Sequence, residues 1–489
     1  MKKAKHVHFI GIKGVGMTAL AVLAKEAGIR VTGSDLEEKF ITDTVLERAG
    51  IKWRIGFSPK NIEGQPDLVI ATGAHGGMEN PEAKYAQEIG LATVMQGEAV
   101  GMFMNGEFLG RQNLEGISVA GSHGKTSTAA MISVILAQDN LDPSFVIGCG
   151  GILPLGFPGH FGRGKYFVAE ADEYATCPQT DKTPKFLWQN PKILVVANIE
   201  YDHPDVFADI SQVKEAFLKF AQKLPNDGTL VAGKDNPNVR DLLKAVNCRV
   251  VSFGEGPKND WRLKKFLSGE GKTRFWVEYR GKNLGDFSLS LPGKFNALNA
   301  LGAIIVGLEL GISPVKIKKT LAGFRGTKRR FEFIGEVGDI KLYDDYAHHP
   351  TEISETLAAA KDFFPGQKII CVFQPHTYSR TKALLADFAR CFSGAWEVLI
   401  LDIYSSAREK SDFGVNAKIL TEEIAKHHPR VKYLGKMEKV IDYLGKNVGG
   451  GSVIFTMGAG DVFLWHKEIL DALENDSQIR QLAEGGRPY

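Results

Sequence analysis

The sequence predicts an α/β protein with three domains, each built around a sheet of mainly parallel strands. Short apolar runs alternate with helical stretches along the chain, which is typical of parallel α/β architecture. Two of these runs lead directly into glycine-rich turns that open helices, at residues 11–16 and 121–124. The length of 489 residues corresponds to two to four domains at roughly 100–200 residues per domain.

The composition is that of an ordinary globular protein and argues against several other classes. Hydrophobic residues make up 44% and charged residues 24%, so disorder and coiled coil are disfavoured. A formal charge of +3 implies no nucleic-acid partner, and no apolar run reaches the ~18 residues that membrane insertion requires. The basic residues 1–5 are interpreted as the lead into a first strand rather than a signal peptide. Five scattered cysteines without a CxxC pair fit a reducing cytoplasm.

The first domain is predicted to span residues 1–112 and to hold the first glycine turn. Its expected strands are 6–10, 30–33 and 67–71, with a helix over 17–28 that ends at a glycine. A polar, glycine-rich stretch at 106–113 marks its boundary.

The central domain is predicted over 113–325 and the C-terminal domain over 326–489, with a linker at 323–329. The central strands are expected at 116–120, 166–169 and 193–197, followed by an antiparallel edge meander over 261–291 and a helix over 297–310. The C-terminal strands are expected at 340–343, 369–373, 397–401 and 452–456, with helices between them.

The sequence VAGSHGKTS is the strongest chemical signal. An apolar strand enters a glycine turn, and the helix that follows opens with Lys-Thr, so backbone N–H groups and the helix N-terminus can hold phosphates. The lysine can reach the β- and γ-phosphates, and the threonine hydroxyl can ligate Mg²⁺. The spacing departs from the general phosphate loop, because two residues rather than four separate the glycines. The predicted phosphate-binding residues are Gly121, Ser122, His123, Gly124, Lys125, Thr126 and Ser127.

The first glycine turn is similar to a dinucleotide fingerprint but reads GxxGxG. Gly11, Gly14 and Gly16 lie between a strand and a helix, and Ser34-Asp35 ends the next strand, where a ribose-binding carboxylate would lie. The turn therefore predicts binding of a nucleotide pyrophosphate. The alternative is close helix–strand packing that merely requires glycine.

Acidic clusters follow two strands of the central domain. EADE (170–173) and NIEYDH (198–203) both end apolar strands, and in a parallel sheet such ends meet at the edge that carries the phosphate loop. Oxygen ligands at that edge suit Mg²⁺; the alternative is a pair of solvated loops. Two further clusters, at 343–350 and 373–381, favour anion or substrate recognition over a transition metal, because their paired histidines have no third close ligand.

Taken in order, nine motifs resemble the Mur ligase family of peptidoglycan synthesis, and they span residues 8 to about 460. They are GIKGVGM, TGSD, GSHGKTS, EADE, NIEYDH, GKFNALNA, KRRFE, YDDYAHHPTE and FQPHTYSRT. The resemblance implies a Rossmann-like UDP-binding domain, a phosphate-loop ATPase domain and a C-terminal Rossmann-like domain. It also implies a cytoplasmic, ATP-dependent ligase with two Mg²⁺ ions that acts as a monomer or weak homodimer and joins L-alanine to UDP-N-acetylmuramate through an acyl phosphate.

The resemblance also implies a role for each matching position. Lys125 would stabilise the γ-phosphate, Thr126 and Glu170 would ligate one Mg²⁺, and His203 would ligate a second. The uridine nucleotide would contact Gly11, Gly14, Gly16, Ser34 and Asp35. The adenine would lie at Asn296 and Asn299, the γ-phosphate at Arg329 or Arg330, and the ATP ribose at Asp345. The incoming amino acid would lie near His348, His376 and Arg380.

The chain departs from the family pattern in three places. Phe295 stands where related sequences tend to have histidine, and Phe217 stands where many Mur ligases carry a carbamylated lysine, with Lys214 close by. Segments between Glu173 and Phe207 resemble instead a sister enzyme that attaches the tripeptide L-Ala-γ-D-Glu-meso-diaminopimelate to the same sugar nucleotide, so tripeptide addition is the alternative function.

Two alternatives lie outside the family. A nicotinamide-dependent oxidoreductase would use the first glycine turn and Asp35, but it would leave Lys125 and Thr126 without a role. A non-enzymatic nucleotide-binding regulator is disfavoured because the phosphate and metal positions are all chemically competent.

Overall fold

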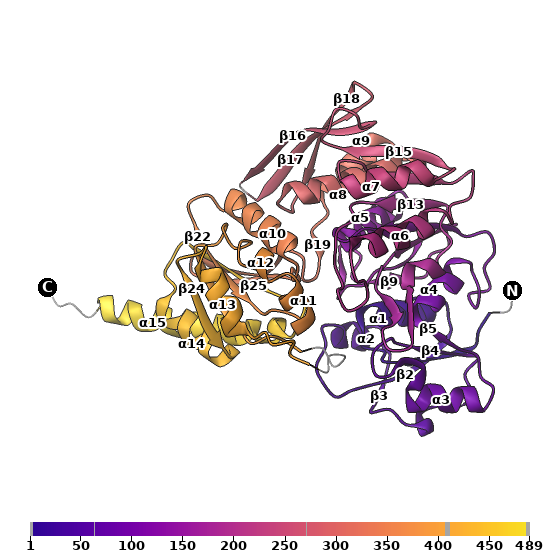
Figure 1. The fold of residues 1–489 in the computed structure, drawn as a ribbon, viewed down its shortest axis with the longest axis horizontal. Coiled ribbons are helices and arrows are strands. Elements are labelled where there is room, and N and C mark those ends of the chain that lie inside the picture. The colour runs from indigo at the N-terminus through magenta and orange to yellow at the C-terminus, as the bar shows by residue number, and fades with distance from the viewer. Residues whose placement is uncertain (1–2, 63, 270, 406–410, 486–489) are drawn as a thin grey trace. The chain divides into compact units, whose positions relative to one another are not determined.

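The computed structural model describes residues 3–62, 64–269, 271–405 and 411–485, and it has the predicted three-domain α/β fold (Figure 1). The N-terminal and central domains pack together as one compact unit, and the C-terminal domain belongs to a second. The first unit comprises Met1–Leu267, Arg274–Ser290 and Phe295–Lys328; the second comprises Ser268–Thr273, Leu291–Lys294 and Arg329–Tyr489.

The N-terminal domain is a five-stranded parallel sheet in the order β3-β2-β1-β4-β5. Its strands β1 and β4 are apolar and buried along their whole length, as is typical of the centre of a parallel sheet. The strands are β1 (His6–Ile10), β2 (Arg30–Asp35), β3 (Arg54–Ile55), β4 (Leu68–Ala71) and β5 (Thr93–Met95). The helices are α1 (Val15–Glu26), α2 (Asp43–Arg48), α3 (Pro81–Glu88) and α4 (Gln96–Met104).

The central domain is a ten-stranded sheet in the order β18-β17-β16-β15-β14-β13-β6-β10-β7-β9. The predicted edge meander is present: two residues join β17 to β18, so these neighbours run antiparallel. The strands of this sheet are β6 (Glu115–Ala120), β7 (Ser144–Val146), β9 (Gly159–His160), β10 (Tyr166–Glu170), β13 (Ile193–Val196), β14 (Thr229–Gly233), β15 (Arg249–Gly254), β16 (Trp261–Gly269), β17 (Lys272–Tyr279) and β18 (Lys282–Leu289).

Helices and two small sheets complete the central domain. The helices are α5 (Lys125–Gln138), α6 (Ile210–Ala221), α7 (Pro237–Leu242), α8 (Lys294–Glu309) and α9 (Pro314–Ala322). The small sheets pair β11 (Ala175–Cys177) with β12 (Asp181–Pro184), and β8 (Ile152–Leu153) with β19 (Gly326–Thr327).

The N-terminal and central domains share a hydrophobic core. Helix α1 packs against β7 and β9, and Val146, Phe167 and Ala169 of the central sheet join the cluster formed by the first domain. The approach is close, because a Cβ at Gly159 would lie 1.9 Å from the Ala19 carbonyl oxygen. The N-terminal and central domains are therefore held together by side-chain packing and not only by the chain that connects them.

The C-terminal domain is a six-stranded sheet in the order β20-β21-β25-β22-β23-β24, parallel except for β20. Its strands are β20 (Glu332–Val337), β21 (Ile340–Asp345), β22 (Lys368–Phe373), β23 (Glu397–Leu401), β24 (Val431–Gly435) and β25 (Ser452–Met457). Its helices are α10 (Pro350–Phe363), α11 (Tyr378–Ala383), α12 (Leu385–Phe388), α13 (Ala417–Ala425), α14 (Met437–Asn447) and α15 (His466–Gly485).

The strands that sequence reasoning missed lie mostly at sheet edges. Strands β20 and β24 flank the C-terminal sheet and are only partly buried, so their polar residues hide the apolar pattern of a parallel strand.

In the described part of the chain, no helix is long and apolar enough to cross a membrane.

Candidate active site

The phosphate loop lies where the sequence places it, between β6 and α5. Gly124 caps α5 with a φ of 80°, a left-handed conformation that glycine adopts without strain. A side chain here would also collide with Asn299, since a Cβ would lie 2.2 Å from its Oδ1 atom. Asn296 and Asn299 are both buried on α8, so the structure brings the predicted adenine region against the loop through Asn299.

Side chains of the loop brace it rather than point outward. Ser122 Oγ accepts the Glu200 N–H at 2.8 Å, and the His123 ring contacts Glu200 Oε2 at 3.2 Å. Asn198 bridges the backbone of His123, accepting its N–H at 2.9 Å and donating to its carbonyl oxygen at 3.1 Å. The predicted contribution of Ser122 and His123 to phosphate binding therefore falls mainly to their backbone, which the segment after β13 holds in place.

Lys125 is folded back over the loop. Its Nζ donates to the carbonyl oxygen of Gly121 at 2.7 Å and lies 2.8 Å from Glu173 Oε2. Burial opposes the charged amine, but the carboxylates of Glu173 and Asp172 outweigh it and raise the pKa of Lys125. A permanently charged lysine therefore lies at the mouth of the loop, as phosphate binding requires.

Thr126 and Glu170 form the first candidate cation site. Thr126 Oγ1 donates to Glu170 Oε1 at 3.0 Å, and Glu170 Oε2 accepts the Gly148 N–H at 2.9 Å. Burial raises the pKa of Glu170. A hydroxyl and a carboxylate oxygen side by side are the donor set that Mg²⁺ prefers, so these two predicted ligands fit the ion.

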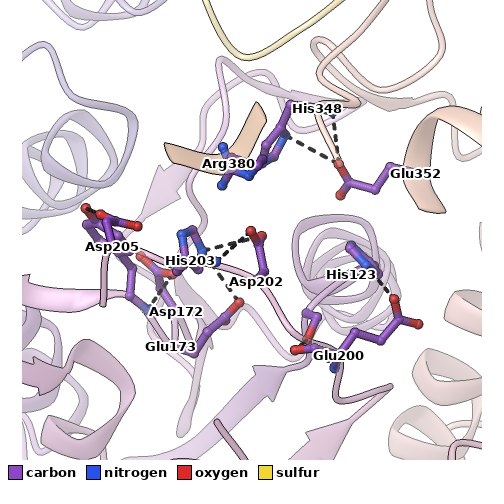
Figure 2. Close-up of polar contacts among 12 residues, drawn as sticks. His123, Asp172, Glu173, Glu200, Asp202, His203, Asp205, His348, Glu352 and Arg380 are labelled. Carbon is purple, nitrogen blue, oxygen red and sulfur yellow. Dashed lines mark hydrogen bonds and ion pairs between the residues drawn. The ribbon is translucent and has the colours of Figure 1, made fainter. Parts of the chain in front are cut away.

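His203, the predicted ligand of a second Mg²⁺ ion, lies beside two acids that were not predicted individually as ligands. Its Nε2 is 3.8 Å from Glu173 Oε1 (Figure 2), and ligand atoms of Asp172, Glu173 and His203 all lie within 4.8 Å of one another. The EADE cluster as a whole was a candidate for Mg²⁺, but the family resemblance implied a ligand role for Glu170 alone. The turn at residues 170–173 instead points successive acids toward both candidate sites.

Phe217, which the sequence pattern places where many Mur ligases carry a carbamylated lysine, belongs to the hydrophobic core. Phe217 is fully buried, with its ring 5.2 Å from that of Phe186 in an edge-on contact. Lys214 instead pairs with Asp241 at 2.7 Å on the surface. Lys214 and Phe217 therefore offer no ligand at the site, consistent with the departure noted in the sequence.

The first glycine turn is organised by buried polar contacts. Gly11, with a φ of 77°, donates its N–H to the Ser34 carbonyl oxygen at 2.8 Å. Gly14 caps α1, and a Cβ at Gly16 would lie 2.9 Å from the side chain of Gln96. Asp35 Oδ2 accepts the N–H of Lys13 at 2.7 Å, and burial raises its pKa. Asp35 therefore supports the turn, and its contact with a nucleotide stays a prediction.

Ser34 has a supporting contact within the domain, and its contact with ligand stays a prediction. Its side chain is fully buried, and its Oγ donates to Glu82 Oε2 at 2.6 Å. Glu82 also accepts from His8, Asn61 and the Ser58 N–H, at 3.0, 2.6 and 2.9 Å. The sequence offered no signal for this network, because its members come from four separate segments.

We expect Glu82→Gln to destabilise the N-terminal domain by about 1–3 kcal/mol at neutral pH. Burial alone would raise the pKa of Glu82, but its four donors outweigh burial and hold the pKa below its ordinary 4.5. A lowered carboxyl pKa stabilises the fold above the unfolded-state value, and this stabilisation is lost as the pH falls through the folded-state value. The loss on substitution should therefore shrink in acid. Hydrogen exchange of β1 and α3 amides measures it, with the exposed Glu79→Gln as the control; equal effects of both variants would contradict the prediction.

In the C-terminal domain, the structure separates the two arginines of KRRFE. Arg329 is buried, and its guanidinium donates to Asp344 at 2.8 Å and to the carbonyl oxygens of Gly458 and Gly460 at 2.7 and 3.1 Å. These contacts hold Arg329 in the fold of the domain, and its contact with phosphate stays a prediction. Arg330 is half-buried, with its Nη1 atom 3.6 Å from Glu352 Oε1, and it remains a candidate γ-phosphate ligand.

Asp345 has a structural role that the sequence did not reveal. Its carboxylate accepts the N–H groups of Phe331 and Ala347 at 2.9 and 2.8 Å. Burial raises its pKa to about 6, although the charge of Arg330 and both N–H bonds oppose the shift. Its remaining oxygen lone pairs are the acceptors that the predicted ribose contact would use.

The three residues predicted to meet the amino acid lie together in the C-terminal domain. The His348 and His376 rings are 6.3 Å apart, and Arg380 Nη1 lies 3.4 Å from His376 Nδ1. His348 Nδ1 faces the Tyr346 carbonyl oxygen at 3.0 Å and Glu352 at 3.4 Å. Glu352, which sequence reasoning missed, opens α10 one turn after His348. Two acceptors facing Nδ1 require the proton there, so the Nε2 atom of neutral His348 carries the lone pair.

One unit of the structure contains the phosphate loop with Lys125, the hydroxyl–carboxylate pair of Thr126 and Glu170, and the glycine turn at residues 11–16. These features define a phosphate-loop nucleotide-binding protein of Mur ligase architecture. Three family models match the chain in succession: the "Mur ligase family, catalytic domain" over residues 6–108, the "Mur ligase middle domain" over 119–307 and the "Mur ligase, glutamate ligase domain" over 329–460. The chain belongs to the Mur ligase family.

Individual relatives agree with the family match. The UDP-N-acetylmuramate–L-alanine ligase of Alkaliphilus metalliredigens is 41% identical, covering 94% of this chain and 96% of that protein. The ligase of the same name from Caldanaerobacter subterraneus is 40% identical, with coverage of 95% and 96%. Among solved structures, the UDP-N-acetylmuramate-alanine ligase of Thermotoga maritima is 27% identical with a TM-score of 0.78, covering 96% of this chain and 99% of that one. A murein peptide ligase from Psychrobacter arcticus is 26% identical, with a TM-score of 0.70 and the same coverage.

Proposed function

We propose that this chain is an ATP-dependent ligase that joins L-alanine to the lactyl carboxylate of UDP-N-acetylmuramate, in the cytoplasm, during peptidoglycan synthesis. One observation of the structure carries the proposal. Gly148 separates the candidate cation site from the N-terminal glycine turn, since a Cβ there would lie 3.3 Å from Glu170 Oε2 and 3.7 Å from Val15 at the start of α1. A carboxylate attached to a nucleotide at that turn can therefore reach a γ-phosphate at the loop.

The residues present support an acyl-phosphate route. A carboxylate oxygen attacks the γ-phosphorus, ADP leaves, and the amine nitrogen then attacks the acyl carbon and expels phosphate. Lys125 and Arg330 stabilise the charge on the transferred phosphoryl group, which is the main catalytic demand of such transfers. Arg380 orients the amino-acid carboxylate, and His348 Nε2 accepts the proton that the amine loses.

Two Mg²⁺ ions fit the acids of the central domain. Thr126 and Glu170 would hold one, and His203 with Glu173 would hold the other. When bound, these ions neutralise charge on the phosphates. Glu173 would then exchange Lys125 for the cation, which leaves the lysine to follow the γ-phosphate. The same acids explain why the site suits hard, oxygen-preferring ions.

L-Alanine is the proposed amine, and the tripeptide is not favoured. The two relatives above that are 40% identical or more over nearly the whole chain are named alanine ligases, and of the two solved structures above, the alanine ligase has the higher TM-score, 0.78 against 0.70. The resemblance to the tripeptide-adding enzyme is confined to the chain between Glu173 and Phe207, which carries Glu173 and His203 of the second candidate cation site.

The test is phosphate release with Mg-ATP and UDP-N-acetylmuramate while the amine is varied. L-Alanine, glycine, L-serine and L-Ala-γ-D-Glu-diaminopimelate are compared, and the product mass is measured. We expect turnover with L-alanine, with glycine and serine poorer by about 10–200-fold, the range for one methyl or hydroxyl group. Turnover with the tripeptide alone would replace the proposal by a recycling ligase. The enzyme should run as a monomer or weak homodimer in sedimentation measurements.

A further inference from the structure

His203 is held in an unusual backbone conformation at the candidate cation site. Its φ is 57°, in the left-handed region that residues other than glycine seldom occupy. Its N–H donates to Asp202 Oδ1 at 2.7 Å, and its carbonyl oxygen accepts the N–H groups of Val206 and Phe207, both at 2.9 Å. A conformation of this kind persists only where the surroundings hold it, so the turn at residues 203–207 requires an anchor.

Tyr174 supplies contacts on two sides of this turn. Its ring packs against the His203 ring at 4.7 Å between centroids, and its hydroxyl donates to Asp205 Oδ2 at 2.6 Å. Lys185 holds the tyrosine in turn: its backbone N–H donates to the Tyr174 carbonyl oxygen at 2.9 Å, and its ammonium lies 5.4 Å from the ring centre. Tyr174 is buried whereas Asp205 is exposed, so the hydroxyl–carboxylate bond is partly buried.

The bond joins the two segments that carry the candidate ligands. Tyr174 follows Glu173 directly in the chain, and Asp205 is two residues beyond His203. The contact between Tyr174 and Asp205 therefore ties together the segments that carry Glu173 and His203, whose Oε1 and Nε2 atoms lie 3.8 Å apart. Phe217 fills the position where other members of the family use a modified lysine, so this chain has one ligand fewer to orient an ion there.

We propose that Tyr174 and Asp205 are positioning residues that lock the His203 turn and thereby set the affinity of the second cation site. The inference rests on the proposed function, in which His203 is a cation ligand. Partners of a metal ligand commonly change metal affinity by 10–100-fold when they are removed. Because Tyr174 acts on His203 through the turn and the ring face, we expect the lower end, about tenfold.

The experiment measures Mn²⁺ binding by electron paramagnetic resonance, with a non-hydrolysable ATP analogue present, in the full chain. The variants are Tyr174→Phe, Asp205→Ala and their combination, with His203→Ala as the reference for loss of the ligand. Tyr433→Phe is the matched control, because Tyr433 donates to Asp402 at 2.6 Å in the C-terminal domain. The Mg²⁺ dependence of turnover and the thermal unfolding temperature are measured in parallel.

We expect one Mn²⁺ to bind about tenfold more weakly in Tyr174→Phe, in Asp205→Ala and in the double variant alike, because all three break one bond. The required Mg²⁺ concentration should rise while KM for UDP-N-acetylmuramate stays constant, and Tyr433→Phe should match the wild type. Unchanged Mn²⁺ affinity in Tyr174→Phe, whatever its unfolding temperature, would overturn the inference. If His203→Ala also binds Mn²⁺ normally, the cation role of His203 in the proposed function fails as well.

Discussion

Replacing Lys125 by alanine is expected to lower kcat by about 10³-fold or more, since the variant loses the fixed positive charge on the transferred phosphoryl group. In the structure, this lysine is the charged group that touches both the loop carbonyls and Glu173. The chain should remain folded. Burial already raises the pKa of Glu173, so its carboxyl group can take up a proton when the contact with Lys125 is lost. Phosphate release under saturating substrates measures the effect.

The matched control for this variant is Lys165→Ala. Lys165 also pairs with a carboxylate of the central sheet, Glu115 at 2.8 Å. This pair is exposed and lies where β6 and β10 begin, at the other end of these strands from the phosphate loop. It should leave kcat within about twofold of the wild type, as is usual for an exposed pair. Near wild-type turnover in Lys125→Ala, with circular dichroism unchanged, would remove the loop from the reaction.

Substitution of the neighbouring arginines is expected to separate stability from catalysis. Arg329→Met should destabilise the C-terminal domain by about 3–5 kcal/mol, the usual cost of leaving one partner of a buried ion pair alone. Asp344 is fully buried; burial would raise its pKa, but the charge of Arg329 outweighs burial and lowers it. Without the arginine, Asp344 keeps the hydrogen bond from Thr456 and the His466 ring at 3.4 Å but loses its buried guanidinium partner, and two backbone carbonyl oxygens lose their donor.

Arg330→Met should have the opposite profile. Its ion pair with Glu352 spans 3.6 Å and is partly exposed, so the stability loss should stay below about 1 kcal/mol. Its kcat should fall by about 10²-fold if the guanidinium stabilises the γ-phosphoryl group. Hydrogen exchange of β21 and β25 amides reports stability domain by domain, which suits a chain that need not unfold in one step. An unstable Arg330→Met beside a stable, inactive Arg329→Met would reverse the assignment.

The fold of this chain follows largely from local patterns. Apolar runs such as β1, β4 and β13 are long enough to read as buried parallel strands, and a glycine turn before a helix is visible in any single segment. The predicted strands of all three domains are present for this reason. Strands β20 and β24 were not predicted because both are edge strands with partly exposed, polar residues, which interrupt the apolar run that identifies a buried parallel strand.

The residues of the candidate site also fall into two groups, those placed by the local sequence and those placed by contacts distant in the chain. Lys125, Thr126 and Glu170 could be selected from the sequence because the backbone conformation of a strand end or loop places each of them directly. Ser34 and Arg329 were assigned to ligands, but they have buried partners distant in the sequence, Glu82 and Asp344. A motif indicates which residue types are present, whereas burial and long-range pairing decide whether a polar group supports the fold or faces a substrate.

The sequence by itself determined the family, the order of the domains and the chemistry of the phosphate loop, because these depend on residue types at short spacing. Only the tertiary structure decided that Glu173 shares a site with both Lys125 and His203, and that Tyr174 reaches Asp205. The physical reason is that β10 and β13 flank β6 in the sheet. Parallel pairing brings their ends together, as the sequence predicted, but which side chains of the two clusters meet depends on the turns that follow the strands, and no local pattern specifies those turns.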